Sequence, residues 1–472
     1  MREKYYLDND WYFSEKWEAA QSNAEYDEAA MQSVRIPHTV KELPFHYFDE
    51  HAYQMVSGYR RHLLVKKEWE GKVVRLTFEG AAHDSEVYVN GKKAGAHHCG
   101  YTAFTIDVSA LLHYGEDNII AVRVDSNENL NIPPFGFVID YMTYGGIYRD
   151  VYLEINEESY LADVFLKPQV ELETKRGTLL SEITLAGSKD NLLLRQYIRK
   201  KGEEEYRLIG EETFSEIPTQ EGKKTLAFPA GVVSLWDVEN PALYEVKTQL
   251  VTGNNIIDEV ITTVGFRQAV FQKDGFYLNG QKLRIRGLNR HQSYPYVGYA
   301  MPASIQRMDA EVLKKELGLN AVRTSHYPQS QEFINSCDEL GLMVFTEIPG
   351  WQHIGDEAWK AQAVENVKDM VTQYRNHPSI ILWGVRINES QDDDEFYRRT
   401  NAIAHKLDDT RQTGGVRAHK KSSLLEDVYT YNDFVHDGLN KGCEHKKDVT
   451  SDIEKPYLIT EYNGHMYSTK AF

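Results

Sequence analysis

Between residues 282 and 463 the sequence alternates short apolar runs with segments of helical period, and this alternation constrains the fold more than any other feature. The predicted strands are 282–289, 320–326, 342–348, 380–388, 413–417, 427–432 and 457–463, and helices are predicted at 330–340, 357–375 and 393–407. Another helix is indicated where apolar residues recur at helical spacing from Ile305 to Leu317 before Gly318, a typical C-cap. Such alternation predicts parallel βα units.

The number of these strands predicts a (β/α)8 TIM barrel that lacks its last strand, because only residues 464–472 follow the seventh run. We therefore expect a polypeptide that is truncated at its C-terminus; the alternative is that one strand has been miscounted. A missing strand would leave the edges of the first and seventh strands unpaired.

The residues before the barrel are rich in short strands with turn residues between them. Alternating runs at 72–80, 85–95 and 118–125, with the hairpin signal Asn90-Gly91, predict an antiparallel β-sandwich over residues 1–155. Further short strands predict a smaller sandwich of immunoglobulin type over 156–265. The catalytic barrel would then occupy residues 266–472.

Composition narrows the class of partner. The net charge of -18 argues against nucleic acid and anionic membrane, because phosphate groups are held by lysine and arginine. Cys99, Cys337 and Cys443 form no CxxC pair and are expected to be free thiols. With no apolar leader and no long apolar run, we expect a cytoplasmic protein.

Two acids follow apolar strands of the predicted barrel. Glu389 ends the stretch SIILWGVRINES (379–390), and Glu461 follows YLIT (457–460) on the seventh strand. The C-terminal ends of barrel strands open at the face where barrel enzymes carry out their chemistry. A pair of carboxylates across that mouth is the equipment of glycoside hydrolysis, with about 5 to 5.5 Å between them for retention and about 6.5 to 9.5 Å for inversion. The alternative for Glu389 is a helix-start acid.

Five motifs in order carry a resemblance to a known family. GLNRHQSYP (287–295), NAVRTSHYP (320–328), DELGLMVFTEIPGW (338–351), WGVRINES (383–390) and ITEYNGH (459–465) resemble glycoside hydrolase family 2. The resemblance implies a jelly-roll sugar-binding domain, an immunoglobulin-like domain and a TIM barrel, in this order. It also implies that Glu389 is the general acid/base and Glu461 the nucleophile of a retaining exo-glycosidase. The stretch TEYNGHMYSTKAF (460–472) is most similar to β-galactosidases.

Further site residues follow from the same resemblance. The residues expected to bind substrate are Asn388, His326, Asp140, His353, Trp351, Tyr431 and Asn432. The residues expected to contact and orient the acids without touching the substrate are Asn289, Arg290, His291 and Arg323. Alternatives stay open: a satisfied buried histidine for His326, a plain loop carboxylate for Asp140, and simple packing for the rim residues around Trp351 and Tyr431. Arg323 would hold a neighbouring carboxylate ionised.

No cofactor and no metal is expected, because EIPGWQH (347–353) lacks the full acid-and-histidine pattern that holds magnesium in some family members. The expected partner is a β-galactoside, and a homo-oligomer is compatible with the sequence. Two alternatives remain: a β-glucuronidase or another family activity, and an inactive truncated fragment that only binds carbohydrate.

Overall fold

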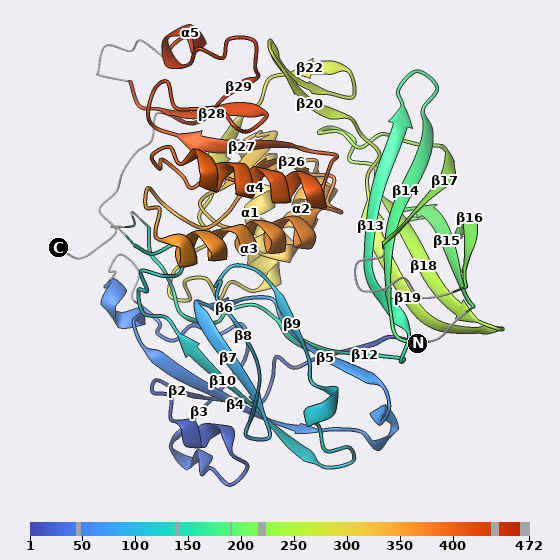
Figure 1. Ribbon diagram of the computed structural model, residues 1–472, viewed down its shortest axis with the longest axis vertical. Coiled ribbons are helices and arrows are strands. Elements are labelled where there is room, and N and C mark those ends of the chain that lie inside the picture. The colour runs from blue at the N-terminus through green and yellow to red at the C-terminus, as the bar shows by residue number, and fades with distance from the viewer. Residues whose placement is uncertain are drawn as a thin grey trace.

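The computed structural model describes residues 1–43, 49–136, 139, 141–188, 191–215, 223–435 and 443–462. Two β-sandwiches adjoin a barrel of parallel strands, with the first sandwich below the barrel and the second beside it in Figure 1. The prediction of two sandwiches followed by a parallel barrel is confirmed, and seven barrel strands lie in the described residues. Cys99, Cys337 and Cys443 are free, as expected.

The first sandwich consists of a four-stranded sheet in the order β1-β12-β5-β9 and a six-stranded sheet in the order β3-β2-β4-β10-β7-β8, with β11 paired to β6. Alternate residues of each strand face inward and fill the core, Trp11, Tyr59 and Leu76 among them. The strands are β1 (Glu3–Tyr6), β2 (Trp11–Ser14), β3 (Gln32–Val34), β4 (Val56–Leu64), β5 (Val73–Phe78), β6 (Ala81–Ala82), β7 (Asp84–Val89), β8 (Lys92–His97), β9 (Phe104–Asp107), β10 (Asp117–Asp125), β11 (Gly146–Ile147) and β12 (Val151–Asn156). Short 3-10 turns lie at Ala19–Ser22, Glu28–Ala30, Glu50–Tyr53, Lys67–Trp69 and Ser109–Leu111.

The second sandwich packs a three-stranded sheet, β13-β14-β17, on a four-stranded sheet, β16-β15-β18-β19. Its strands are β13 (Tyr160–Glu171), β14 (Arg176–Ala186), β15 (Leu192–Lys200), β16 (Arg207–Phe214), β17 (Lys224–Val232), β18 (Tyr244–Thr252) and β19 (Asn255–Val264). Asn376, which follows α3 (Glu357–Tyr374) of the barrel, accepts from Leu166 N and donates to Val164 O, each at 2.9 Å. This amide therefore joins β13 to the barrel.

A three-stranded antiparallel sheet, β20 (Ala269–Gln272), β21 (Gly275–Leu278) and β22 (Gln281–Leu283), precedes the barrel. The prediction of one barrel strand over 282–289 was therefore wrong in its first half, because Lys282 and Leu283 pair with β21. The cause is a hairpin turn at Asn279 and Gly280, whose φ angles of 51° and 76° suit the tight two-residue loop of an Asn-Gly pair.

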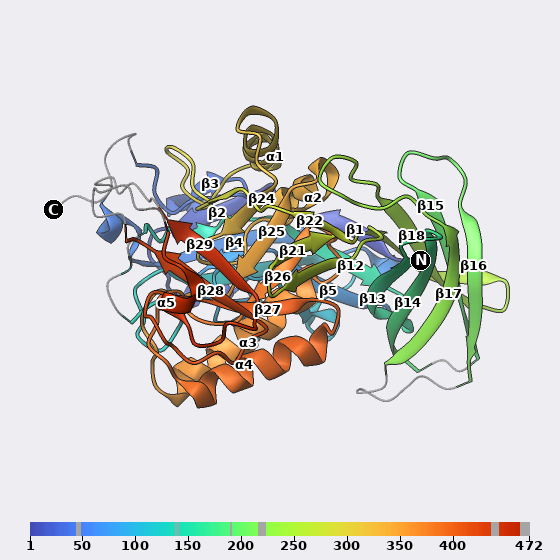
Figure 2. The same ribbon diagram turned by 90° about the horizontal axis from the view of Figure 1, so that it is seen from above.

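Seven parallel strands form the barrel in sequence order, from β23 to β29. They are β23 (Gly287–Asn289), β24 (Ala321–Thr324), β25 (Met343–Glu347), β26 (Ile380–Gly384), β27 (Gln412–Arg417), β28 (Val428–Asp433) and β29 (Tyr457–Tyr462). The helices are α1 (Ala303–Glu311), continued by a π-helical turn at Val312–Glu316, α2 (Gln331–Leu340), α3, α4 (Asp394–Leu407) and the short α5 (Lys446–Val449). Strands β24 to β29 follow an arc with α3 and α4 on its outer side (Figure 2).

The outer strands of this sheet are each paired on one side. Within the described residues β23 pairs only with β24, and β29 pairs only with β28. A cavity of about 100 Å³ lies between them and is lined by Leu288, Leu458 and Tyr462 among others. Leu288 and Tyr462, on these two strands, are 50% and 59% exposed.

Candidate active site

Arg323 at the end of β24 is the centre of a hydrogen-bond network at the barrel mouth. Its side chain is almost fully buried, and Nε and Nη2 donate to the two oxygens of Glu347 at 2.9 and 2.8 Å. Nη1 donates to Oε2 of Glu461 at 3.1 Å, and Nη2 also donates to Oδ1 of Asn388 at 2.8 Å. The planar guanidinium thus fixes side chains from β25, β29 and the loop after β26 in one place.

Asn432 on β28 links the two acids predicted to do chemistry. Its Nδ2 donates to Oε1 of Glu389 and to Oε2 of Glu461, each at 2.9 Å, and also lies 3.3 Å from Oδ1 of Asn388. The two carboxylate oxygens are therefore at most 5.8 Å apart, twice 2.9 Å. This bound on one pair of oxygens is compatible with the separation of about 5 to 5.5 Å between carboxyl groups that accompanies retention.

The two carboxylates have different surroundings. Glu461 is paired with the Arg323 guanidinium and retains 27% exposure of its side chain. Glu389 receives hydrogen bonds from two neutral amides, those of Asn432 and of Gln352, whose Nε2 lies 3.3 Å from Oε2. In the described residues Arg323 is the one cation within hydrogen-bond reach of either acid, and it contacts Glu461.

Glu347 belongs to this site although it was absent from the predicted set. Its carboxylate is 1% exposed and lies 2.7 Å from Nδ1 of His326 as well as against Arg323. Burial by itself would raise its pKa, but the Arg323 charge and the contacts from His326 and Arg323 outweigh burial and lower the pKa. The signal was present in the sequence, since Glu347 also ends an apolar strand, as Glu389 and Glu461 do.

Residues of the first sandwich reach the barrel mouth. The Tyr141 ring lies 5.8 Å from that of His326, centroid to centroid, and Phe135 O accepts from Nε1 of Trp359 at 3.1 Å. Gly136 packs so closely on His353 that a Cβ there would lie 2.0 Å from Cδ2 of the ring. Asp140, the acid predicted to enter the site from this loop, lies outside the described residues.

Trp351 and His353 lie on the rim next to the candidate acid. Trp351 forms an isolated parallel bridge with Asn388, and the next residue, Gln352, donates its N–H to Asn388 O at 2.7 Å. His353 lies edge-on to Trp359, with ring centroids 5.7 Å apart. Both side chains thus border the mouth between the first sandwich and the loop that carries Glu389.

Other predicted residues lie farther from the acids. Tyr431 packs with Tyr429 and Val449 in a small cluster, because adjacent residues of a strand face opposite sides and Asn432 takes the inner one. Arg290 is bound to Asp309 of α1 and to Gln329 instead of to the acids. Asn289 is exposed on the edge strand β23, and His291 contacts His326 with centroids 5.4 Å apart.

No group of three or more His, Cys, Asp or Glu side chains suited to a metal ion occurs in the part of the chain that the structure describes. The expectation of no essential metal stays a prediction. None of the described helices has the length and apolar character to cross a membrane.

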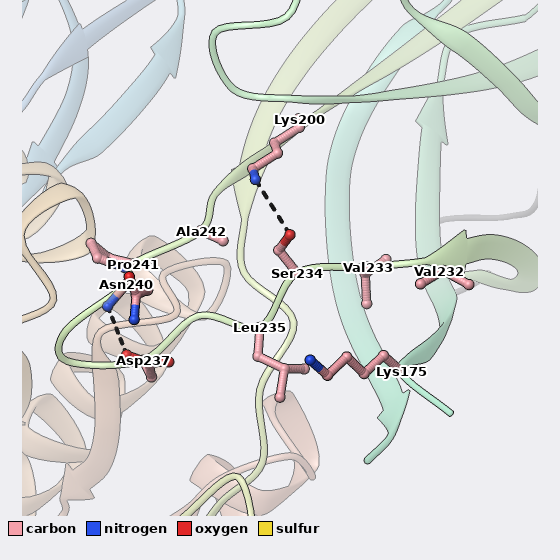
Figure 3. A pocket seen from close by; sticks show the side chains of 10 residues that line it. All are labelled: Lys175, Lys200, Val232, Val233, Ser234, Leu235, Asp237, Asn240, Pro241 and Ala242. Atoms are coloured by element: carbon pink, nitrogen blue, oxygen red, sulfur yellow. Dashed lines mark hydrogen bonds between the residues drawn. The ribbon is translucent and has the colours of Figure 1, made fainter. Parts of the chain in front are cut away.

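A larger hollow of about 750 Å³ is lined by residues of the second sandwich and of the segment between β17 and β18 (Figure 3). Lys200 and Ser234 meet there, with Nζ 3.3 Å from Oγ, and Asp237 is its one lining acid. A lone carboxylate does not provide the acid and nucleophile that glycoside hydrolysis needs. The barrel mouth, where Asn432 brings Glu389 and Glu461 together, is the candidate active site.

Comparison with known protein families gives three matches along the chain. Residues 7–156 match the sugar binding domain of glycosyl hydrolases family 2, residues 159–267 match a domain described by that family name alone, and residues 270–471 match the family's TIM barrel domain.

Individual relatives carry two activities in their names. A β-galactosidase of Thermoanaerobacterium thermosulfurigenes is 49% identical over 487 residues, covering 100% of this chain and 66% of the relative. A putative β-glucuronidase of Formosa agariphila is 30% identical, covering 98% of this chain and 57% of the relative. The solved structure of β-glucuronidase 2 of Bacteroides uniformis superposes with a TM-score of 0.81 at 26% identity, covering 92% of this chain and 55% of the other. The chain thus spans about two thirds or less of the length of these proteins.

Proposed function

Because the chain belongs to glycoside hydrolase family 2, we propose that it hydrolyses terminal non-reducing β-D-galactosides with retention of configuration. The observation that carries the proposal is the amide of Asn432, which lies 2.9 Å from an oxygen of Glu389 and 2.9 Å from an oxygen of Glu461. This spacing suits two acids that act on one glycosidic bond in a double displacement.

Glu389 is the proton donor in this proposal and Glu461 is the nucleophile. Glu461 attacks the anomeric carbon while Glu389 protonates the departing oxygen, which breaks the glycosidic bond and forms a glycosyl ester. Glu389 then removes a proton from water, which attacks the anomeric carbon and releases Glu461 as a carboxylate. The contact with Arg323 holds the Glu461 carboxyl in place for this attack.

The neighbouring polar side chains bind and orient the sugar. The side chain of Asn388, fixed by Arg323 through Oδ1, has an amide that is suited to the 2-hydroxyl, where a hydrogen bond strengthens in the transition state. The Nδ1 of His326 is engaged by Glu347, so Nε2 is the ring nitrogen that can meet a sugar hydroxyl. Trp351 and His353 border the same mouth and provide aromatic surface for a ring.

The names of the relatives support a galactoside as the substrate over other glycosides. The relative that is 49% identical over the full length of this chain is named a β-galactosidase, and so is a second relative at 45% identity. A β-glucuronidase is the second candidate, because a relative at 30% identity and the superposed solved structure carry that name.

A panel of aryl glycosides tests the proposal. The purified chain and its Glu461→Gln variant are incubated with the 4-nitrophenyl β-galactoside, β-glucuronide, β-mannoside and β-glucoside, and nitrophenol release is followed. We expect release from the galactoside by the unchanged chain and loss of nearly all turnover in Glu461→Gln. Faster hydrolysis of the glucuronide would favour the second candidate. Galactoside binding in calorimetry without hydrolysis of any substrate would support a chain that only binds carbohydrate.

A further inference from the structure

Arg386 is a fully buried cation three residues before the candidate acid Glu389. It lies just after β26, where its side chain has 0% exposure, and its guanidinium carbon lies 4.7 Å from the centroid of the Tyr397 ring. Its Nη2 donates to Ser390 O at 3.1 Å and to Oδ1 of Asp392 at 2.6 Å. One guanidinium therefore holds the backbone that immediately follows Glu389.

The backbone at Glu389 needs such support. Its φ angle of +57° lies in the left-handed region, which costs a residue with a side chain about 1 to 2 kcal/mol. The N–H of Glu389 donates to Val416 O at 3.0 Å, and Ser390 Oγ lies 2.6 Å from the Tyr397 hydroxyl. The N–H of Ser390 donates to Ile387 O at 3.3 Å, so both peptide groups that flank Glu389 are hydrogen-bonded, and the bond from Arg386 to Ser390 O fixes the next peptide group.

The other end of this contact is anchored in the loop between β27 and β28. Asp392 Oδ2 accepts from Ser423 N at 2.9 Å, and Ser423 O in turn accepts from Nη2 of Arg417 at 2.8 Å. Arg417 is fully buried and paired with Glu426. A continuous series of hydrogen bonds thus runs from Arg417, through the Ser423 backbone, Asp392 and Arg386, to the carbonyl of Ser390.

Stability alone does not account for Arg386. Its Nε and Nη1 are buried and have no hydrogen-bond partner among the described residues. A buried guanidinium with unmatched donors loses hydration that its ion pair does not fully restore, and an apolar side chain of similar volume is often as stable or more so. What an apolar side chain could not supply is the hydrogen bond to Ser390 O.

We propose that Arg386 is a positioning residue that sets the direction of the Glu389 carboxyl toward the glycosidic oxygen. The inference rests on the proposed function, in which Glu389 is the acid. It predicts a defect of a particular kind, because proton donation matters most when the leaving group is poor. A loss of general stability would instead affect all substrates alike.

The test compares Arg386→Lys with the unchanged chain on phenyl β-D-galactoside, a poor leaving group, and 2,4-dinitrophenyl β-D-galactoside, a good one. The value of kcat/KM is used because it reports the step in which Glu389 donates its proton. We expect a fall of about 10- to 100-fold for the phenyl substrate and of less than about 3-fold for the dinitrophenyl substrate. Arg398→Gln, on the exposed side of α4 and paired with Asp394 at 3.3 Å, is the control and should change neither value.

Asp392→Asn is the second variant, for use if Arg386→Lys does not fold, since the Asp392 side chain is 38% exposed and its loss is less disruptive. It should show the same preference for the good leaving group, with a loss of about 10-fold for the phenyl substrate. Equal losses on both substrates, or no loss on either, would overturn the positioning role. An unchanged chain that hydrolyses neither substrate would overturn the proposed function, and this inference with it.

Discussion

The Nη1 of Arg323 donates to Oε2 of Glu461 at 3.1 Å, and the same guanidinium donates to both oxygens of Glu347. One buried cation therefore serves two carboxylates, one inside the barrel and one at its mouth. Removing a partner from such a group leaves the remaining charges unmatched in a region shielded from water.

Glu347→Gln should destabilise the barrel by about 3 kcal/mol at pH 7, because one partner of a buried ion pair is removed. The ordinary pKa of 4.5 applies to the unfolded chain, and folding lowers the pKa of Glu347. The stabilisation from this carboxylate is therefore complete above about pH 4.5 and is lost as the pH falls through the lower, folded value. Urea unfolding followed by tryptophan fluorescence should show a difference from the unchanged chain that narrows below pH 4.5.

The control for this effect is Glu339→Gln. Glu339 makes exposed ion pairs with Lys201 and Arg307, at 2.8 and 2.6 Å, and should change stability by less than about 1 kcal/mol. A Glu347→Gln difference that is as small as that of the control, or that grows in acid, would contradict the assigned role of the Arg323 pair.

Asn432→Ala should lower kcat/KM for aryl galactosides by about 100-fold, because the amide that holds Glu389 and Glu461 in register is lost. Asn432 is 2% exposed, so the unfolding midpoint should fall as well, and activity is measured well below that midpoint. The matched control is Asn335→Ala on α2. In the described residues the Asn335 amide forms one side-chain hydrogen bond, with Gln331. Full activity in Asn432→Ala would show that the amide does not set the spacing of the acids.

Glu389→Ala should separate proton donation from nucleophilic attack. Its kcat/KM for phenyl β-D-galactoside should fall by about 10²- to 10⁴-fold, while that for the dinitrophenyl substrate falls far less. Added azide should accelerate turnover of the dinitrophenyl substrate, because azide needs no base, and should yield the β-galactosyl azide. Formation of the α-galactosyl azide by this variant would show that Glu389 is the nucleophile and Glu461 the acid.

Gly136→Ala tests the contact between the first sandwich and the barrel mouth. The φ angle of +133° disfavours a side chain, and the new Cβ would lie 2.0 Å from Cδ2 of His353. We expect KM for galactosides to rise several-fold as His353 moves. Gly202→Ala is the matched control, since its φ angle is +95° but no atom lies within 4 Å of the new Cβ. It should cost about 1 kcal/mol of stability and leave KM unchanged, and equal KM values in both variants would argue against a role for this contact.

Much of the barrel could be predicted because its strands are buried on both faces and read as continuous apolar runs. The predicted helices at 330–340, 357–375 and 393–407 differ from α2, α3 and α4 by one residue at most at each end. The first strand was the exception, because Gln281, Lys282 and Leu283 of β22 form a hairpin with β21 before β23 begins. The turn at Asn279-Gly280 was the available signal.

The site could be predicted where an acid ends a strand. It was harder to predict which residues of a strand point toward the acids. Asn432 and Tyr431 are adjacent on β28, yet only Asn432 faces the acids, and a run without polar alternation does not reveal which side is which. The network around Arg323 depends on side chains from four separate segments, and only the tertiary structure brings these segments together. Glu347 was missed for this reason, although its position resembles that of Glu389.

The most direct test of the central claim is to trap the glycosyl ester. The chain is incubated with 2,4-dinitrophenyl 2-deoxy-2-fluoro-β-D-galactoside, whose fluorine slows release of the sugar from the enzyme, and the labelled peptide is sequenced by mass spectrometry. The account predicts a single fluorogalactosyl group on Glu461 and none in the Glu461→Gln variant. A label on Glu389, or time-dependent inactivation without a label on either acid, would contradict it.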